Sequence, residues 1–218
     1  MTQPAVPADQ VQDRPQAYEV VDSVERFDGA VWTVRSDTVR LPDGETVVRD
    51  VVDHPGAVGV VALDEDGRVL LVQQYRHPVQ QLLWEPPAGL LDDEAEGERA
   101  VEAAARELHE EAGYRASDWR VLADLFNSPG GTSEAVRVYL ARGLEQVPDG
   151  ERHEGRHEEA DMPIAWLPLD DAVAKVLAGE LHNPIAVAGV LAAAAARART
   201  GGFDALRPAD APWPARDR

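Results

Sequence analysis

The sequence has 218 residues, 44% of them hydrophobic, which is enough for one sizeable domain with an appendage or for two small domains. Its formal net charge of −19 at pH 7 repels nucleic-acid backbones and anionic membranes, so we expect neither as a partner, and a phosphate-bearing ligand would need a cation or a few placed arginines. The chain has no cysteine, which excludes a disulfide framework, a thiolate nucleophile and a zinc–cysteine site. With no basic and apolar leader at its start, we expect a cytoplasmic protein.

The first part of the chain predicts a tail followed by a small sheet. Residues 1–16 are polar and contain prolines, which predicts a flexible tail. Residues 17–55 contain strand-like alternation interrupted by a turn at 42–44, which predicts an N-terminal antiparallel β-sheet domain. The Pro-Gly break at 55–56 marks the expected domain boundary.

The second part of the chain, residues 56–200, mixes strands and helices. Apolar runs predict strands at 57–63, 68–75, 119–125 and 135–142, and helical periodicity predicts helices at 98–112, 169–178 and 183–198. These elements alternate without regular βαβ spacing, so the predicted class is an α/β/α sandwich with a mixed sheet. Residues 201–218 return to proline and charge, which predicts a C-terminal surface tail.

The predicted helix at 98–112 carries an unusual concentration of negative charge. Glu107, Glu110 and Glu111 stand three and four residues apart, so their carboxylates share one patch. Like charges at this spacing destabilise a helix, and oxygen ligands suit a hard divalent cation such as Mg²⁺. The alternative interpretation is a solvated acidic face on a very acidic protein.

The residues around this patch form a longer motif. Arg106 to Tyr114 read RELHEEAGY, with Gly89 and Glu98 upstream, and the run resembles the signature of Nudix hydrolases. The gap between Gly89 and Glu98 is three residues longer than in the family pattern, so Glu94 and Glu96 stay rivals for the Glu98 position.

The resemblance implies a fold, a reaction and a set of residues. The fold is a Nudix-type α/β/α sandwich, and the reaction is hydrolysis of a nucleoside diphosphate linked to another group, with Mg²⁺ as cofactor and Mn²⁺ as a possible substitute. Implied metal ligands are the carbonyl of Ala88 and the carboxylates of Glu107, Glu111 and Glu110. Implied motif residues are Gly89, for a tight turn; Glu98; Arg106, which orients a ligand glutamate; and Gly113, which ends the helix.

Three further features are similar to the ADP-ribose pyrophosphatase branch of the family. These are the segment 74–78, reading QYRHP before the Pro-Ala-Gly of 87–89, a proline at position 129, and the extra N-terminal sheet. The branch implies hydrolysis of ADP-ribose to AMP and ribose 5-phosphate by a homodimer with shared active sites, in which residues 17–55 serve dimerisation. Substrate-binding candidates are Arg76, Glu85, Glu134 and Trp32.

The location of the catalytic base varies within the family that the motif resembles, so we look for it first outside the signature. In the ADP-ribose branch it comes from a loop that matches Glu158 or Glu159 here, with Glu158 favoured and Glu110 as the reserve candidate. Residues 153–157 also satisfy the zinc-protease pattern His-Glu-any-any-His, but a central glycine and the lack of an apolar face disfavour a helix there. Hydrolysis of a nucleotide sugar, a dinucleotide or NADH, and nucleotide binding without catalysis, remain alternatives.

Overall fold

The computed structural model describes residues 5–91, 97–148, 150 and 162–216. The chain divides into two compact units, Met1–Val52 and Asp53–Arg218, and the division falls close to the Pro-Gly break at 55–56. In the described part of the chain, no helix is both long and apolar enough to cross a membrane.

The N-terminal unit is a three-stranded sheet in the order β1-β2-β3, with strands Val20–Asp28, Thr33–Arg40 and Thr46–Asp53. The turn between β2 and β3 lies where the sequence predicts it, with Gly44 at a φ of 90°. Short hydrogen bonds between hydroxyls and carboxylates join the strands, from Ser23 to Asp37 and from Ser36 to Asp50, both at 2.6 Å. Every residue of β1 is exposed, including its apolar side chains.

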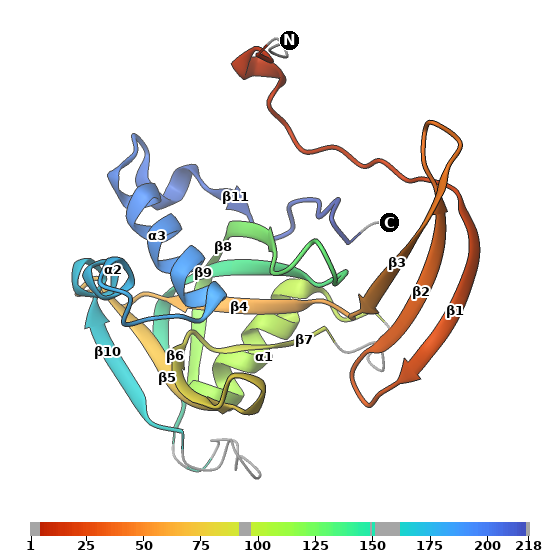
Figure 1. Ribbon diagram of the computed structural model, residues 1–218. Helices are drawn as coiled ribbons and strands as arrows, with labels where there is room; N and C mark the ends of the chain where they lie inside the picture. The colour runs from red at the N-terminus through yellow and green to blue at the C-terminus, as the bar shows by residue number, and fades with distance from the viewer. Residues whose placement is uncertain (1–4, 92–96, 149, 151–161, 217–218) are drawn as a thin grey trace. The chain divides into compact units, whose positions relative to one another are not determined.

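The C-terminal unit is built on two sheets (Figure 1). The larger has the order β11-β8-β9-β4-β7, with strands Arg207–Pro208, Tyr114–Phe126, Ala135–Gln146, Ala57–Ala62 and Ala88–Leu90. It is mixed, because β4 runs parallel to β9 and antiparallel to β7. The smaller is antiparallel and has the order β10-β5-β6, with strands Ile164–Pro168, Arg68–Arg76 and Gln81–Glu85. The predicted mixed α/β class is confirmed.

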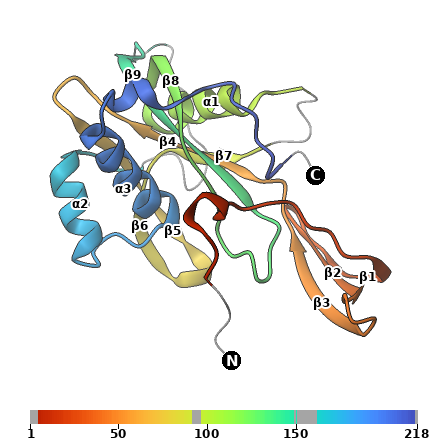
Figure 2. The same ribbon diagram turned by 90° about the horizontal axis from the view of Figure 1, so that it is seen from above.

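Helices cover both faces of these sheets, and all three lie close to their predicted ranges. Helix α1, Ala100–Ala112, packs through Ala104 and Leu108 against one core cluster, while α2, Leu169–Leu177, and α3, Pro184–Ala198, pack against the other. Figure 2 shows the strands between α1 and α3. Short 3-10 turns lie at Ala8–Gln10, His77–Val79 and Gly202–Ala205.

The segment expected to be a C-terminal tail is packed against the sheet. Strand β11 pairs with β8, and Trp213 is only 6% exposed within the core cluster on the α1 side. The buried guanidinium of Arg137, on β9, explains this packing, because it donates to the carbonyls of Ala211 and Pro212 and lies 4.8 Å from the centre of the Trp213 ring. Proline and charge in a sequence therefore do not exclude a packed segment.

Candidate active site

Helix α1 presents its carboxylates on a fixed scaffold. At its start the Glu102 carboxylate accepts from the N–H of Arg99 at 3.0 Å and from the Arg99 guanidinium, and Ala104 and Leu108 are fully buried in the core. The helix ends at Gly113, which has a φ of 69° and donates its N–H to the carbonyl of His109, as expected for a glycine in the left-handed region. Packing and both caps therefore fix the helix that carries Glu107, Glu110 and Glu111.

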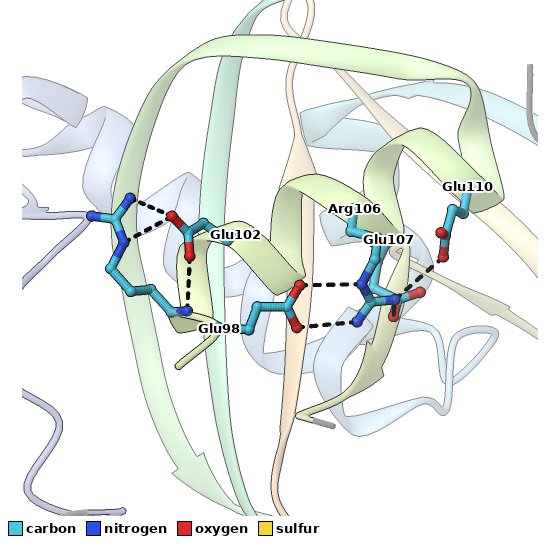
Figure 3. A network of polar contacts seen from close by, with 6 residues as sticks. Glu98, Glu102, Arg106, Glu107 and Glu110 are labelled. Carbon is cyan, nitrogen blue, oxygen red and sulfur yellow. Dashed lines mark hydrogen bonds and ion pairs between the residues drawn. The ribbon is translucent and has the colours of Figure 1, made fainter. Parts of the chain in front are cut away.

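Arg106 joins three of the carboxylates into one network (Figure 3). Its Nη1 donates to Glu107 Oε1 at 2.6 Å and to Glu110 Oε2 at 3.3 Å, and its Nε donates to Glu98 Oε1 at 3.3 Å. Burial alone would lower the pKa of Arg106, but the hydrogen bond with Glu98 and the charge of Glu107 raise it above its ordinary value. The contact with a signature glutamate that we expected of Arg106 is present, and Glu98 takes part in it. The rival positions 94 and 96 lie outside the described residues.

Strand β7 and the residue before it bring backbone groups close to the carboxylates of α1. The N–H of Ala88 donates to Glu111 Oε2 at 3.0 Å, and the carbonyl of Pro87 accepts from the N–H of Val60 at 2.8 Å. A Cβ on Gly89 would lie 2.1 Å from Glu107 Oε1, so a larger residue at this position would displace the Glu107 carboxylate. Close approach to Glu107 is thus a second reason for glycine here, beside the tight turn that the sequence indicates.

The α1 acidic patch, which we define as Glu98, Glu107, Glu110 and Glu111, contains more negative than positive charge. Three of its four carboxylates, those of Glu98, Glu107 and Glu110, contact the guanidinium of Arg106, and the fourth, Glu111, accepts from the N–H of Ala88. Oxygen donors with excess negative charge fit a hard divalent cation. In this conformation no three acidic or imidazole side chains of the described residues converge as a ready metal site. Glu107 and Glu110 contact Arg106 through one oxygen each, and Glu111 accepts a backbone N–H through one oxygen.

Arg76 and Glu85, both expected to bind substrate, are paired with each other. Arg76 Nε donates to Glu85 Oε1 at 2.9 Å, and Arg76 Nη2 donates to Glu85 Oε2 at 2.6 Å. This bidentate contact joins the last residues of β5 and β6. Sequence reasoning identified both residues but missed the pair. The sequence predicts no strand over Gln81–Glu85, and therefore no register that would bring the two side chains together.

The remaining expected site residues lie elsewhere. Glu134 is half-buried at the end of the 128–134 loop, where its N–H is bound by Thr132 Oγ1 at 3.1 Å. Trp32 belongs to the N-terminal unit and is 44% exposed. The base candidates Glu158 and Glu159, and the His-Glu-Gly-Arg-His run at 153–157, lie outside the described residues.

Comparison with known proteins decides the family. The model of the NUDIX domain matches residues 53–186, which is more than half of the chain. The chain belongs to the Nudix family. It is 49% identical over 196 residues to an ADP-ribose pyrophosphatase of Mycobacterium tuberculosis, covering 90% of this chain and 91% of the relative. It is 34% identical over 157 residues to an ADP-ribose pyrophosphatase of Bacillus subtilis, covering 72% of this chain and 82% of that one.

A solved structure has the same fold. The crystal structure of an ADP compounds hydrolase superposes with a TM-score of 0.66 at 22% identity, covering 83% of this chain and 95% of that chain. At this identity the likeness establishes the fold alone. The α/β architecture that carries the α1 acidic patch is therefore shared with this solved hydrolase structure.

Proposed function

We propose that this Nudix protein is a metal-dependent hydrolase that splits the diphosphate of ADP-ribose into AMP and ribose 5-phosphate. The assignment of ADP-ribose as the substrate rests on the 49% identity to an ADP-ribose pyrophosphatase. That match covers 90% of the chain. The unmatched residues are fewer than those of the N-terminal unit, Met1–Val52, so the match includes part of that unit. The likeness thus extends beyond the part that all Nudix proteins share.

Different residues of the chain would have different roles in this reaction. Glu107, Glu110, Glu111 and the carbonyl of Ala88 would hold Mg²⁺, for which Mn²⁺ would substitute. When bound, the ion neutralises the diphosphate and lowers the pKa of water. Arg106 orients the carboxylates through its contacts with Glu98 and Glu107. Arg76 supplies a cation to a substrate phosphate, and Glu158 accepts the proton of the attacking water.

A substrate screen tests the proposal. Purified protein is incubated with ADP-ribose, GDP-mannose, a diadenosine polyphosphate and NADH, each with Mg²⁺ and with excess EDTA, and phosphomonoester products are measured by a coupled phosphatase. We expect ADP-ribose to have the highest kcat/KM and EDTA to abolish turnover. Faster hydrolysis of another substrate would replace ADP-ribose, full activity in EDTA would refute metal dependence, and binding without turnover would identify a regulator.

We further propose a homodimer in which the N-terminal sheet completes the active site of the neighbouring chain, with Trp32 as a substrate contact. Support comes from β1, whose apolar residues Val20, Val24 and Phe27 are all exposed. Val24→Glu should give a monomer with low activity by size-exclusion chromatography with light scattering, whereas Glu25→Gln on the same strand should stay a dimer. A fully active monomer lacking residues 1–53 would refute the shared site.

A further inference from the structure

Glu85 and Arg76 differ sharply in their exposure to solvent. The Glu85 side chain is 2% exposed, whereas 42% of the Arg76 side chain is exposed. Within the described part of the chain, the hydrogen bonds that the Glu85 carboxylate accepts come from Arg76. A buried carboxylate needs such a partner, because burial of an unpaired charge is strongly unfavourable. Glu85 is thus turned inward and bound on both oxygens, and Arg76 faces solvent.

The pair lies on the same side of the sheet as the α1 acidic patch. Glu85 stands opposite Val72 in the β5–β6 register, and Val72 belongs to the core cluster that contains Leu108 of α1. Arg76 is four residues along β5 from Val72, so its side chain leaves the strand on that same face. Glu85 also precedes Ala88 by three residues, which span at most about 11 Å. Ala88 in turn donates its N–H to Glu111.

We propose that Glu85 is a positioning residue, which holds the guanidinium of Arg76 ready for a substrate phosphate and does not contact the substrate itself. A free arginine side chain samples many rotamers, and ordering it weakens binding. A bidentate carboxylate on the Nε and Nη2 edge fixes the plane of the guanidinium and directs Nη1 away from Glu85. The inference rests on the proposed function, because it requires a diphosphate substrate.

Steady-state kinetics with Mg²⁺ and ADP-ribose test this role. Glu85→Gln keeps the shape of the side chain but removes its charge, so we expect KM to rise about tenfold while kcat changes little, the pattern of lost uniform binding. The Mg²⁺ concentration for half-maximal activity should not change. Glu85→Asp, which keeps the charge, should recover part of the loss. Glu180→Gln, which breaks the exposed ion pair with Lys175, is the control and should behave as wild type.

A double-mutant cycle separates positioning from a general effect on the fold. If Glu85 acts only through Arg76, Glu85→Gln should leave KM unchanged in an Arg76→Ala background. An equal rise of KM in both backgrounds, or no rise in either, would overturn the proposal. If Glu85→Gln does not fold, Arg76→Lys replaces it, since lysine keeps the charge beside Glu85 but lacks the planar fork; a KM equal to wild type would then overturn the proposal. Wild-type protein that fails to hydrolyse ADP-ribose would instead refute the proposed function.

Discussion

Two arginines of the C-terminal unit bind carboxylates in opposite kinds of surroundings. Arg106 is 35% exposed and touches the carboxylates of Glu98, Glu107 and Glu110. The Arg137 side chain is 3% exposed, and it pairs with one carboxylate, that of Asp124. Two backbone carbonyls and the ring of Trp213 also contact Arg137.

We infer from this difference that the cluster around Arg106 serves the proposed reaction and the cluster around Arg137 serves stability. Around Arg137 the buried charge is paired with Asp124, which also binds Arg207, and with neutral acceptors, so no carboxylate of this cluster lacks a cation. Around Arg106 the carboxylates outnumber the cation and lie partly in contact with solvent, which leaves capacity for another positive charge. We therefore expect changes around Arg106 to alter hydrolysis, and changes around Arg137 to alter stability.

The largest expected effect follows removal of a carboxylate from the α1 acidic patch. Glu111→Gln should reduce kcat/KM by more than the ~10 to 100-fold that loss of an outer partner of a metal ligand costs. It should also raise the Mg²⁺ requirement, while the melting temperature stays the same or rises, because like charges on the helix are reduced. Glu102→Gln, on the same helix but paired with Arg99, is the control for kinetics and Mg²⁺ titration. A Glu111→Gln variant that is destabilised but fully active would contradict the assignment of the Arg106 cluster to activity and not to stability.

The second prediction asks whether the reactive cluster needs a base from a separate loop. Glu158→Gln should lower kcat by ~10² to 10⁴-fold with little change in KM or in the Mg²⁺ requirement, since a general base acts only on the chemical step. Glu159→Gln should lower kcat by a clearly smaller factor. The double variant His153→Ala, His157→Ala in the same segment should retain hydrolysis. If neither glutamate variant loses more than a few-fold, Glu110 becomes the base candidate.

The order and type of the elements could be predicted from local patterns. Alanines and a leucine at helical spacing, followed by a glycine, predict helix α1. The structure places this helix at Ala100–Ala112. The C-terminal segment could not be predicted in this way. Trp213 is buried because a guanidinium on β9, distant in sequence, binds the carbonyls beside it. No local pattern contains that partner.

The site shows the same division between local and distant information. The clustering of Glu107, Glu110 and Glu111 follows from helix geometry, so it could be predicted from the sequence alone. The pairing of Arg76 with Glu85 depends on the register of β5 and β6, which brings Glu85 opposite Val72. Residue types identified both as site candidates, but only the register reveals that one binds the other.

The third prediction tests the structural cluster with a matched pair of aspartates on β8. Asp124 faces Arg137 and Asp118 faces Arg142 across the same two strands, but the second pair is about one-third exposed on both sides. Asp124→Asn leaves Arg137 buried without its counter-charge and should lower the free energy of unfolding by about 3 kcal/mol. Asp118→Asn should cost about 1 kcal/mol or less. Denaturant unfolding measures both, and equal losses would show that burial does not distinguish these pairs.

The smallest expected effect is the pH dependence of that stability difference. Burial alone would raise the pKa of Asp124, but hydrogen bonds from Arg137 and Arg207 lower it below the ordinary value of 3.8. Because the pKa is lower in the folded than in the unfolded state, ionised Asp124 stabilises the fold above the unfolded-state pKa, and this contribution is lost as the pH falls through the folded-state value.

The difference in unfolding free energy between wild type and Asp124→Asn should therefore be constant at neutral pH and shrink only below the ordinary value of 3.8. Comparing the two proteins at each pH cancels the titration of carboxylates that both contain. Asp118→Asn, measured alongside, should differ little from wild type throughout. A difference for Asp124→Asn that stays constant down to the acid limit would mean that its effect comes from packing around Arg137, and not from the charge of the carboxylate.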